Sequence, residues 1–334
     1  MAAALDRDGR RWWDLEVVRR RMVAADPRRP HNAVLFRQPI STLDDHLARG
    51  LRVEALAELV EGAAADVARN GSDPDDDAVL DTTDLTFGPP ILRPTSLRDF
   101  YAFERHVRTA WERRGQEVPE AWYRVPVFYF SNVSEIRGPD DRVWAPDASR
   151  ELDYELEVAA LIDTPARDLP PERGEESIGG YTILNDWSAR DLQREETTVR
   201  LGPAKSKDFA SSIGPWLVTP DELADARSGK GHALAMSAEV RTPRGSSGGG
   251  DPVTTSRGTW ADIHYSFGEM IARASADARL RAGDLVGSGT VGTGCLLEVK
   301  DDTLGRYLEP DDEVILRVER LGELSTPIVA RPTG

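Results

Sequence analysis

The sequence contains only one cysteine and four lysines among its 334 residues. The single Cys295 excludes an internal disulfide, leads us to expect no cysteine-based zinc site of any kind, and fits a reducing compartment. No apolar run approaches the roughly 18 residues of a membrane span, and residues 1–13 lack the apolar core of a signal peptide. These absences predict a cytoplasmic protein without a membrane partner.

Basic residues are also fewer than acidic residues. The chain carries 42 basic and 58 acidic residues, which gives a net charge of −16. This balance argues against nucleic acid or an anionic membrane as a partner. An apolar content of 40% with 8 Trp, 7 Tyr and 8 Phe is typical of a folded protein. A chain of this length can hold a large core and two domains.

The composition along the chain indicates two domains. Residues 1–88 contain amphipathic helical spacing at 43–69 and no residues that propose chemistry. Residues 89–334 are rich in strand-like segments after residue 120 and contain few helices. We therefore expect a small N-terminal domain at 1–88 and an α+β, mainly β, domain at 89–334.

Two glutamates stand at the start of an expected buried strand. Glu155 and Glu157 are two residues apart, and a strand sends such residues to one face, roughly 7 Å apart. The apolar run at 158–162 that follows does not alternate, which is typical of a strand buried on both sides. A second strand at 178–184 leads to Asp186 at its end. These acids form either a solvated strand face or a site for a cation.

A helix is expected to begin at Ser96, because Ser-Leu-Arg-Asp at 96–99 fits a capping box. Asp99 and His106 are seven residues apart, which places them on one helical face about 10.5 Å apart along the axis. The alternative is that Asp99 only caps the helix and that His106 is a packed or surface residue. The segment 122–130 is expected to be a strand that contains Tyr129.

Two of the four lysines, Lys205 and Lys207, lie within three residues of each other. Either a compact ammonium is needed there, or the spacing is a coincidence. Farther on, Gly287, Gly289 and Gly292 form a G-x-G-x-x-G pattern. We reject a dinucleotide site, because residues 295–299 are strand-like and no βαβ unit surrounds the pattern. A turn that lets the backbone approach a ligand closely is the better interpretation.

Several segments in this order resemble the fumarylacetoacetate hydrolase family, over roughly residues 85 to 320. They are Asp-Phe-Tyr at 99–101 with His106, Asp-Tyr-Glu-Leu-Glu at 153–157, Asn-Asp-Trp-Ser-Ala-Arg-Asp-Leu-Gln at 185–193, Leu-Gly-Pro at 201–203 with Lys207 and Pro-Trp at 215–216, Ser-Phe-Gly-Glu at 266–269, and Gly-Thr at 289–290 with Glu298. The resemblance implies a mixed β-sandwich roll that forms a homodimer.

The resemblance also implies roles for particular residues. The metal ligands it implies are Asp99, Glu155, Glu157 and Asp186. Such an all-oxygen set independently suits Mg²⁺, Ca²⁺ or Mn²⁺ rather than zinc. His106 matches the general base, with Glu298 as its carboxylate partner. Groups that hold the substrate and its developing negative charge are Arg190, Gln193 and Lys207. Further substrate-contacting positions are Tyr101, Tyr129, Thr290 and Ser211.

The activity implied by the resemblance is metal-dependent hydrolysis of a C–C bond in a β-diketo acid. Water activated by His106 attacks a carbonyl, and the metal holds the enolate that leaves. Where fumarylacetoacetase has a Tyr and an Arg that reach the distal carboxylate, this chain has Thr197 and Arg-Arg-Gly at 113–115. An acylpyruvate or another β-diketo acid is therefore the expected class. The alternatives are a decarboxylase, dehydratase or tautomerase of 2-oxo acids, and a catalytically silent protein stabilised by metal.

Overall fold

The computed structural model describes residues 3–5, 12–25, 39–70, 77–81, 85–243 and 250–332. The chain divides into two compact units, Met1–Thr86 and Phe87–Gly334. The predicted domain boundary after residue 88 stays a prediction, because compactness alone does not show that a unit folds independently. Among the described residues, none of the helices has the length and apolar character needed to cross a membrane.

The smaller unit combines helices with a short three-stranded sheet of order β1-β2-β3. Its elements are β1 (Ala3–Leu5), β2 (Trp12–Asp14), α1 (Leu15–Ala25), α3 (Leu43–Ala48), the 3-10 helix η1 (Val53–Leu56), α4 (Ala57–Asn70) and β3 (Val79–Leu80). Trp13, Val18 and Leu59 are buried in its own hydrophobic cluster. The expected helices at 43–69 are therefore present as α3 and α4, joined by η1.

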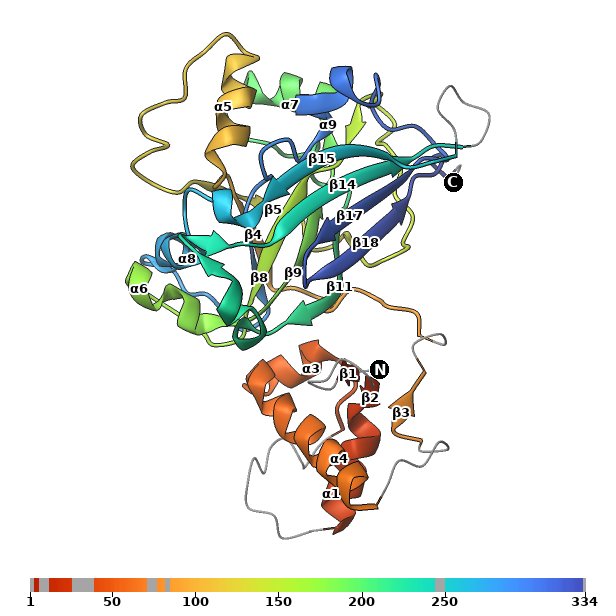
Figure 1. The fold of residues 1–334 in the computed structure, drawn as a ribbon. Coiled ribbons are helices and arrows are strands. Elements are labelled where there is room, and N and C mark those ends of the chain that lie inside the picture. Colours follow the sequence, from red (N-terminus) through yellow and green to blue (C-terminus); the bar gives the residue numbers. More distant parts are fainter. Residues whose placement is uncertain are drawn as a thin grey trace. The chain divides into compact units, whose positions relative to one another are not determined.

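A seven-stranded mixed sheet organises the larger unit, with the order β5-β4-β16-β8-β9-β11-β6 in the described part of the chain. Its strands are β4 (Ser96–Phe100), β5 (Phe128–Ser131), β6 (Ile136–Arg137), β8 (Leu156–Ile162), β9 (Ile178–Asp186), β11 (Ser211–Val218) and β16 (Asp284–Gly287). Every residue of β8 and β9 is buried, as the run of apolar residues without alternation predicted. Both strands are central in the sheet, and the second sheet lies over them (Figure 1).

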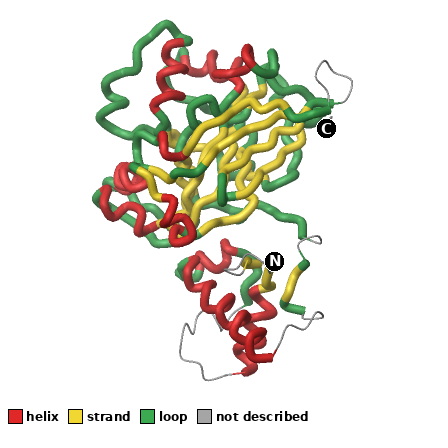
Figure 2. Tube along the Cα trace, viewed as in Figure 1, coloured by secondary structure: helices red, strands yellow, loops and turns green. Residues whose placement is uncertain are grey.

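A second, four-stranded sheet of order β15-β14-β17-β18 packs over β8 and β9 (Figure 2). Its strands are β14 (Ala235–Arg241), β15 (Val253–Thr259), β17 (Glu313–Val318) and β18 (Gly322–Pro327). The alternating buried residues of β14, Met236, Ala238 and Val240, join Val158 and Ile183 of the first sheet in one hydrophobic core. Two layers that share a core make a sandwich, so the larger unit is mainly β. The predicted loop at 243–252 joins β14 to β15, and its residues 244–249 lie outside the described part.

The remaining elements of the larger unit are short. They are α5 (Glu104–Glu112), β7 (Leu152–Asp153), α6 (Pro171–Gly174), η3 (Glu175–Ser177), β10 (Ser188–Ala189), α7 (Arg190–Thr197), η4 (Pro220–Ala226), β12 (Arg227–Ser228), β13 (Gly231–His232), η5 (Trp260–Asp262), α8 (Phe267–Ser275), α9 (Leu296–Val299) and η6 (Lys300–Asp302). Helices α5, α7 and α9 gather at one end of the two layers (Figure 1). Helix α8 follows directly on Ser266, and Ser266 and Glu269 form its capping box.

The predicted helix from Ser96 is wrong. Residues 96–100 form β4, which pairs in parallel with β16 and antiparallel with β5, and the helix α5 begins only at Glu104. The capping-box pattern is a local signal, and pairing with strands on both sides outweighs it. Asp99 and His106 therefore do not share a helical face.

Two further local predictions need correction. Residues 295–299 are not a strand, because Cys295 leads into the four-residue helix α9. The expected strand at 122–130 is confined to β5, which begins at Phe128, and Trp122 lies in a preceding turn. The first ground for rejecting a dinucleotide site was therefore wrong, and the rejection depends on the second. Helix α9 has only four residues, and among the described residues β16 pairs with β4 and β8, not with a later parallel strand, so no βαβ unit follows the glycines.

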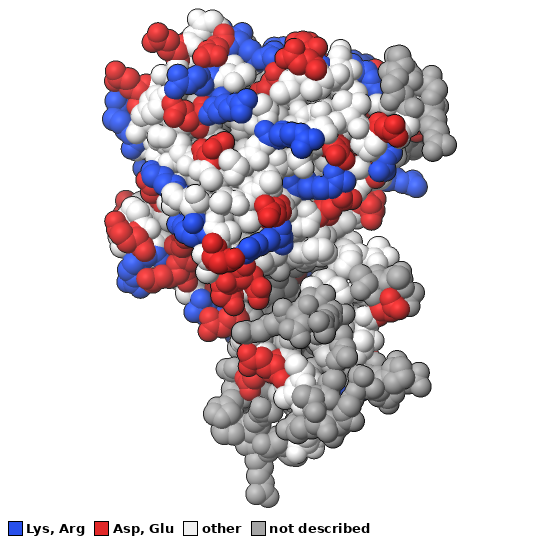
Figure 3. Space-filling view, in the orientation of Figure 1, with Lys and Arg blue, Asp and Glu red and all other residues white. Residues whose placement is uncertain are grey.

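Charged side chains of both signs are interspersed over the visible face of the larger unit (Figure 3). The predicted acidic ligands Asp99, Glu157 and Asp186, in contrast, are buried.

Candidate active site

Three of the four predicted metal ligands meet inside the larger unit. Asp99 comes from β4, Glu157 from β8 and Asp186 from the end of β9. One carboxylate oxygen of each lies within 4.8 Å of the other two. All three side chains are buried, with at most 2% of any residue exposed. We call these three residues the carboxylate cluster.

The glycines after β16 make room for this cluster. Gly287 lies opposite Asp99 in the β4–β16 pair, and a Cβ at Gly287 would collide with Asp99 Oδ1. Gly289 has a φ of 76°, and its N–H donates to Glu157 Oε2 at 3.0 Å. A left-handed backbone and close approach both favour glycine. The predicted close-approach turn is therefore present, and what it approaches is the carboxylate cluster.

The main electrostatic feature of the cluster is the close approach of buried carboxyl groups. Burial and the charge of Asp186 raise the pKa of Asp99 well above its ordinary value. Burial and the charge of Asp99 do the same to the pKa of Glu157. Asp99 Oδ1 and Asp186 Oδ1 are buried without a hydrogen-bond partner. Buried carboxylates of this kind need a proton or a cation, and oxygen donors from three side chains fit a hard divalent cation.

The predicted fourth ligand, Glu155, has different neighbours. Lys207 Nζ contacts Glu155 Oε2 at 2.5 Å, and Arg190 Nη2 pairs with Glu155 Oε1 at 2.7 Å. Burial favours the protonated form, but Lys207 and Arg190 together hold the pKa of Glu155 below its ordinary value. Lys207 Nζ also contacts Asp186 Oδ2, so it bridges Glu155 to the carboxylate cluster. The role of Glu155 as a ligand stays a prediction.

Lys207 is therefore a buried cation. Although burial opposes its charge, Asp186 and Glu155 raise the pKa of Lys207 above its ordinary value. An ammonium held between carboxylates is available as a hydrogen-bond donor to negative charge that develops nearby. The spacing of the lysines alone left coincidence open, whereas the contacts give this one a specific environment.

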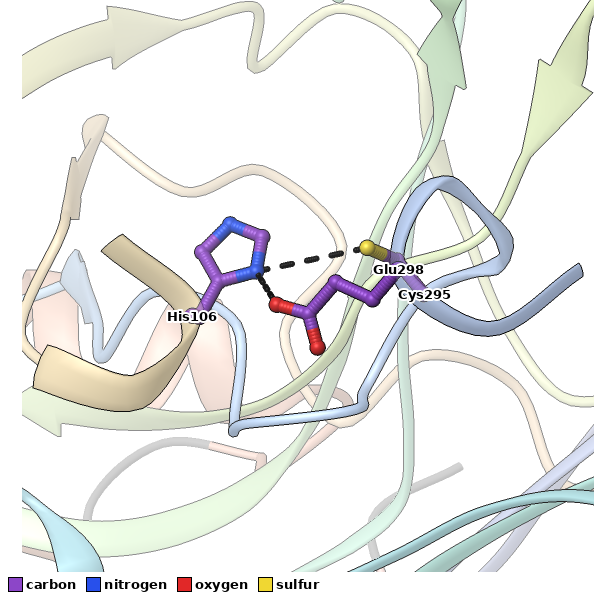
Figure 4. A group of neighbouring side chains, drawn as sticks. All are labelled: His106, Cys295 and Glu298. Atoms are coloured by element: carbon purple, nitrogen blue, oxygen red, sulfur yellow. Dashed lines mark hydrogen bonds and ion pairs between the residues drawn. The ribbon is translucent and has the colours of Figure 1, made fainter. Parts of the chain in front are cut away.

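His106 forms the second feature of the site. It lies on α5, and its Nδ1 hydrogen-bonds to Glu298 Oε1 of α9 (Figure 4). Glu298 Oε2 accepts from the N–H of Thr293, so both oxygens of Glu298 are engaged. A carboxylate only accepts, so Nδ1 carries the imidazole proton and Nε2 keeps a lone pair. Figure 4 shows Nε2 pointing away from Glu298.

The other predicted residues surround these two groups. The Tyr129 hydroxyl donates to Asp186 Oδ2 at 2.5 Å, and the Thr290 hydroxyl donates to Glu157 Oε1 at 3.3 Å. The Tyr101 ring packs edge-on against the His106 ring, with centroids 5.4 Å apart. Ser211 pairs with Asp186 across β11 and β9.

Gln193 accepts a hydrogen bond from Arg190 Nη1 at 3.0 Å. The structure thus places the predicted set in one region, while the role of each residue stays a prediction.

Sequence reasoning gave no role to Asp153 or Cys295. Asp153 is fully buried, and its oxygens accept from the N–H groups of Leu296 and Leu297 and from Arg190 Nε. Asp153 therefore fixes α9, the helix that carries Glu298. Cys295 Sγ lies 4.0 Å from His106 Nδ1. For Asp153 the only sequence signal was its place beside the Glu-X-Glu pattern, and for Cys295 there was none.

The layered mixed fold with its buried carboxylate cluster defines a class of protein. Residues 95–329 match the family model described as fumarylacetoacetate (FAA) hydrolase, C-terminal. The chain therefore belongs to the fumarylacetoacetate hydrolase family, and the predicted α+β, mainly β, fold of that type is confirmed.

Particular relatives place the chain within this family. A fumarylacetoacetase of Oryza sativa subsp. japonica is 28% identical over 278 residues, which cover 67% of this chain and 64% of the rice protein. The match thus spans slightly less than two thirds of that relative. A fumarylacetoacetate hydrolase of Exiguobacterium antarcticum has a TM-score of 0.64 at 23% identity, with 98% of each chain covered.

A 5-carboxymethyl-2-hydroxymuconate delta-isomerase of Mycobacterium smegmatis has a similar fold. Its TM-score is 0.57 at 26% identity, with 77% of this chain and 84% of that chain covered. Proteins named for hydrolysis and for isomerisation thus share this fold.

Proposed function

We propose that the protein is a divalent-metal-dependent hydrolase that cleaves a C–C bond in a β-diketo acid, such as an acylpyruvate or a fumarylacetoacetate-like compound. The observation that carries the proposal is the buried His106–Glu298 pair together with a carboxylate cluster that has unpartnered oxygens. Glu155 connects the two groups, because Lys207 bridges it to Asp186 and the charge of His106 acts on its pKa. One group can take a proton from water, and the other can hold a cation that binds a diketone.

The residues that would hold the metal are Asp99, Glu157 and Asp186, with Glu155 as the predicted fourth ligand. Mg²⁺ and Ca²⁺ suit this all-oxygen set, and Mn²⁺ is an acceptable substitute. When bound, the cation supplies Lewis-acid polarisation of the diketone oxygens. Tyr129 and Thr290 orient two of the carboxylates through their hydroxyl groups.

His106 acts as the general base in this proposal. Glu298 holds the proton on Nδ1, so Nε2 takes a proton from the attacking water. The resulting hydroxide adds to one carbonyl carbon, and Lys207 donates hydrogen bonds to the oxyanion that forms. As the C–C bond breaks, the proton on His106 Nε2 returns to the carbon that leaves. One water is consumed, and two acids are released.

Two residues indicate that the distal part of the substrate differs from fumarylacetoacetate. Arg113 Nη2 donates to the backbone carbonyl of Glu298 at 2.8 Å, so it supports α9. The Thr197 hydroxyl donates to the carbonyl of Arg194, and the residue is half-buried. The contacts of these two side chains do not resemble those of residues that bind a substrate carboxylate. This supports an acylpyruvate or another β-diketo acid as the substrate.

The second candidate is a decarboxylase, dehydratase or tautomerase of 2-oxo acids. A similar fold in a protein named as an isomerase keeps this alternative open. We favour hydrolysis because an imidazole held by a carboxylate is suited to activating water, whereas an enolising enzyme uses its base to take a proton from carbon. The predicted cytoplasmic location and homodimeric state stay predictions, and light scattering would test the second.

Product identification tests the proposal. We would incubate the protein with a panel of β-diketo acids in Mg²⁺, Mn²⁺ or Ca²⁺ and identify the products by mass spectrometry. Hydrolysis gives two acids, decarboxylation gives CO₂, and dehydration or isomerisation gives a single organic product. His106→Gln is expected to lower kcat by about 10²–10⁴-fold. The variant His264→Gln, at a half-buried histidine whose ring packs against Trp122, serves as the matched control. Undiminished turnover in His106→Gln would defeat the proposal.

A further inference from the structure

A sulfur atom lies beside the proposed general base. Cys295 Sγ, His106 Nδ1 and Glu298 Oε1 all lie within 4.8 Å of one another, and all three residues are buried (Figure 4). Cys295 is the only cysteine in the chain. The expectation that no zinc site uses cysteine was based on this count alone and did not consider the histidine and the glutamate that lie beside it. The mechanism proposed above gives this thiol no task.

We propose that Cys295, His106 and Glu298 form a second metal site, which takes a thiophilic cation such as Zn²⁺ and thereby inhibits the enzyme. One sulfur, one imidazole nitrogen and one carboxylate oxygen are the three donor types that zinc uses in proteins. A tetrahedral zinc ion holds such atoms roughly 3.3–3.8 Å apart. The S–N separation of 4.0 Å is close to this value, and the His106–Glu298 pair has to part to admit the ion.

The donor chemistry separates the two sites. The carboxylate cluster offers only oxygen, which suits Mg²⁺ and Ca²⁺, whereas the second site offers sulfur and nitrogen. Burial raises the pKa of Cys295 well above its ordinary value, so the metal-free protein carries a neutral thiol. A zinc ion replaces the thiol proton, an S–Zn bond forms, and the proton passes to solvent. Mg²⁺, which binds sulfur poorly, does not compete for this position.

Occupancy of this site removes the general base by a change of tautomer. When Nδ1 binds the ion, the proton that it carried moves to Nε2, because a neutral imidazole keeps one N–H. Nε2 then has no lone pair to accept a proton from water. Glu298, which orients the ring through Nδ1, is at the same time drawn to the ion. Inhibition therefore follows from binding, without displacement of the substrate or of the catalytic metal.

Cobalt absorption tests the binding, and it does so without any turnover. Co²⁺ would be titrated into the full-length protein in saturating Mg²⁺, and thiolate-to-cobalt charge transfer would be followed in the near ultraviolet. The expected result is a band that saturates at one equivalent in the wild type and is absent in Cys295→Ser. A wild type without the band, or an equal band in Cys295→Ser, overturns the proposal. Cys295→Ala provides a second variant if Cys295→Ser folds poorly.

Zinc titration of activity tests the inhibition, and this part alone rests on the proposed function. Both Cys295 variants are expected to retain basal turnover, because the thiol takes no part in the reaction. They should need at least about tenfold more Zn²⁺ for half inhibition, since loss of a ligand weakens a metal site by that much or more. Equal inhibition of wild type and variants places the ion in the carboxylate cluster and contradicts the proposal. If no diketo acid is turned over, the cobalt spectrum still decides whether the site exists.

Discussion

Two buried aspartates of the larger unit, Asp153 and Asp186, have opposite hydrogen-bonding situations. Every oxygen of Asp153 has a donor, from Leu296, Leu297 and Arg190, at 2.8–2.9 Å. Asp186 receives Tyr129 and Lys207 on Oδ2, while its Oδ1 has no partner. Burial raises the pKa of both carboxyl groups. Both aspartates are buried, but only Asp153 has a hydrogen-bond donor for each of its oxygens.

The difference separates a structural acid, Asp153, from the proposed metal ligand, Asp186. A buried polar atom without a partner costs on the order of 1–3 kcal/mol, and a charged one costs more. A folded protein keeps an unpartnered buried oxygen where another interaction offsets its cost. Asp99 has a second unpartnered oxygen in the same cluster as Asp186. Asp153, in contrast, stabilises α9 and Arg190, so its contribution is to the position of other residues. Substitution of Asp186 should therefore mainly lower activity, and substitution of Asp153 should mainly lower stability.

Asp186→Asn is expected to have the largest effect on activity. The amide keeps the shape of the side chain but weakens the cation site, so turnover should fall by about 10³-fold or more. The free energy of unfolding without metal should change by no more than about 1 kcal/mol, because repulsion from Asp99 and Glu157 is relieved. Steady-state kinetics and urea denaturation in EDTA measure the two quantities. A stable variant with wild-type turnover contradicts the assignment of Asp186.

Asp153→Asn is expected to have its main effect on stability. The substitution leaves the buried Arg190 with Glu155 as its remaining carboxylate partner, so unfolding should become easier by about 3 kcal/mol. The affinity for Mn²⁺ should stay within about threefold of the wild type, because the carboxylate cluster is unchanged. Urea denaturation and a binding titration measure these. Loss of the cation site with unchanged stability would reverse the roles of the two aspartates.

The smallest expected effect concerns His232, because burial favours the uncharged form of its side chain. Its ring lies 4.3 Å from that of Trp260, its Nδ1 has no partner, and burial with the charge of Arg227 lowers its pKa to about 4. The unfolded chain protonates near pH 6.5, so protons favour unfolding between these values. Stability should fall as pH drops from about 6.5 to about 4, by on the order of 2 kcal/mol from this group.

His232→Phe should flatten this part of the pH dependence, whereas the neighbouring control Tyr181→Phe should keep it. Thermal unfolding from pH 7 to pH 4 measures the difference. If His232→Phe loses as much stability on acidification as the wild type, His232 is not the group that titrates in this window.

Some of the fold could be predicted because its signals are local. The uninterrupted apolar run at 158–162 indicated β8, and the helical spacing at 43–69 indicated α3 and α4. The same kind of local signal failed at Ser96, where a capping pattern lies in a strand. Pairing of β4 with β16 joins residues nearly 190 positions apart, and no short window of sequence contains that information.

The candidate site shows the same limit. The oxygen donors were predictable as residue types, and the resemblance to a family supplied their order along the chain. The different roles of the individual acidic residues were not predictable, because they depend on which hydrogen-bond donor reaches which carboxylate oxygen. Glu155 and Asp186 look equivalent in the sequence, yet both Lys207 and Arg190 contact Glu155 while Asp186 keeps an unpartnered oxygen. The approach of Cys295 to His106 spans 189 positions and had no sequence signal.

The most direct test of the account is a crystal structure of the protein with Mn²⁺, with the ion located by its anomalous scattering. The account predicts one ordered peak bonded to carboxylate oxygens of Asp99, Glu157 and Asp186 at roughly 2.1–2.4 Å. Strong anomalous density elsewhere, with these three carboxylates protonated and bonded to one another, would contradict it.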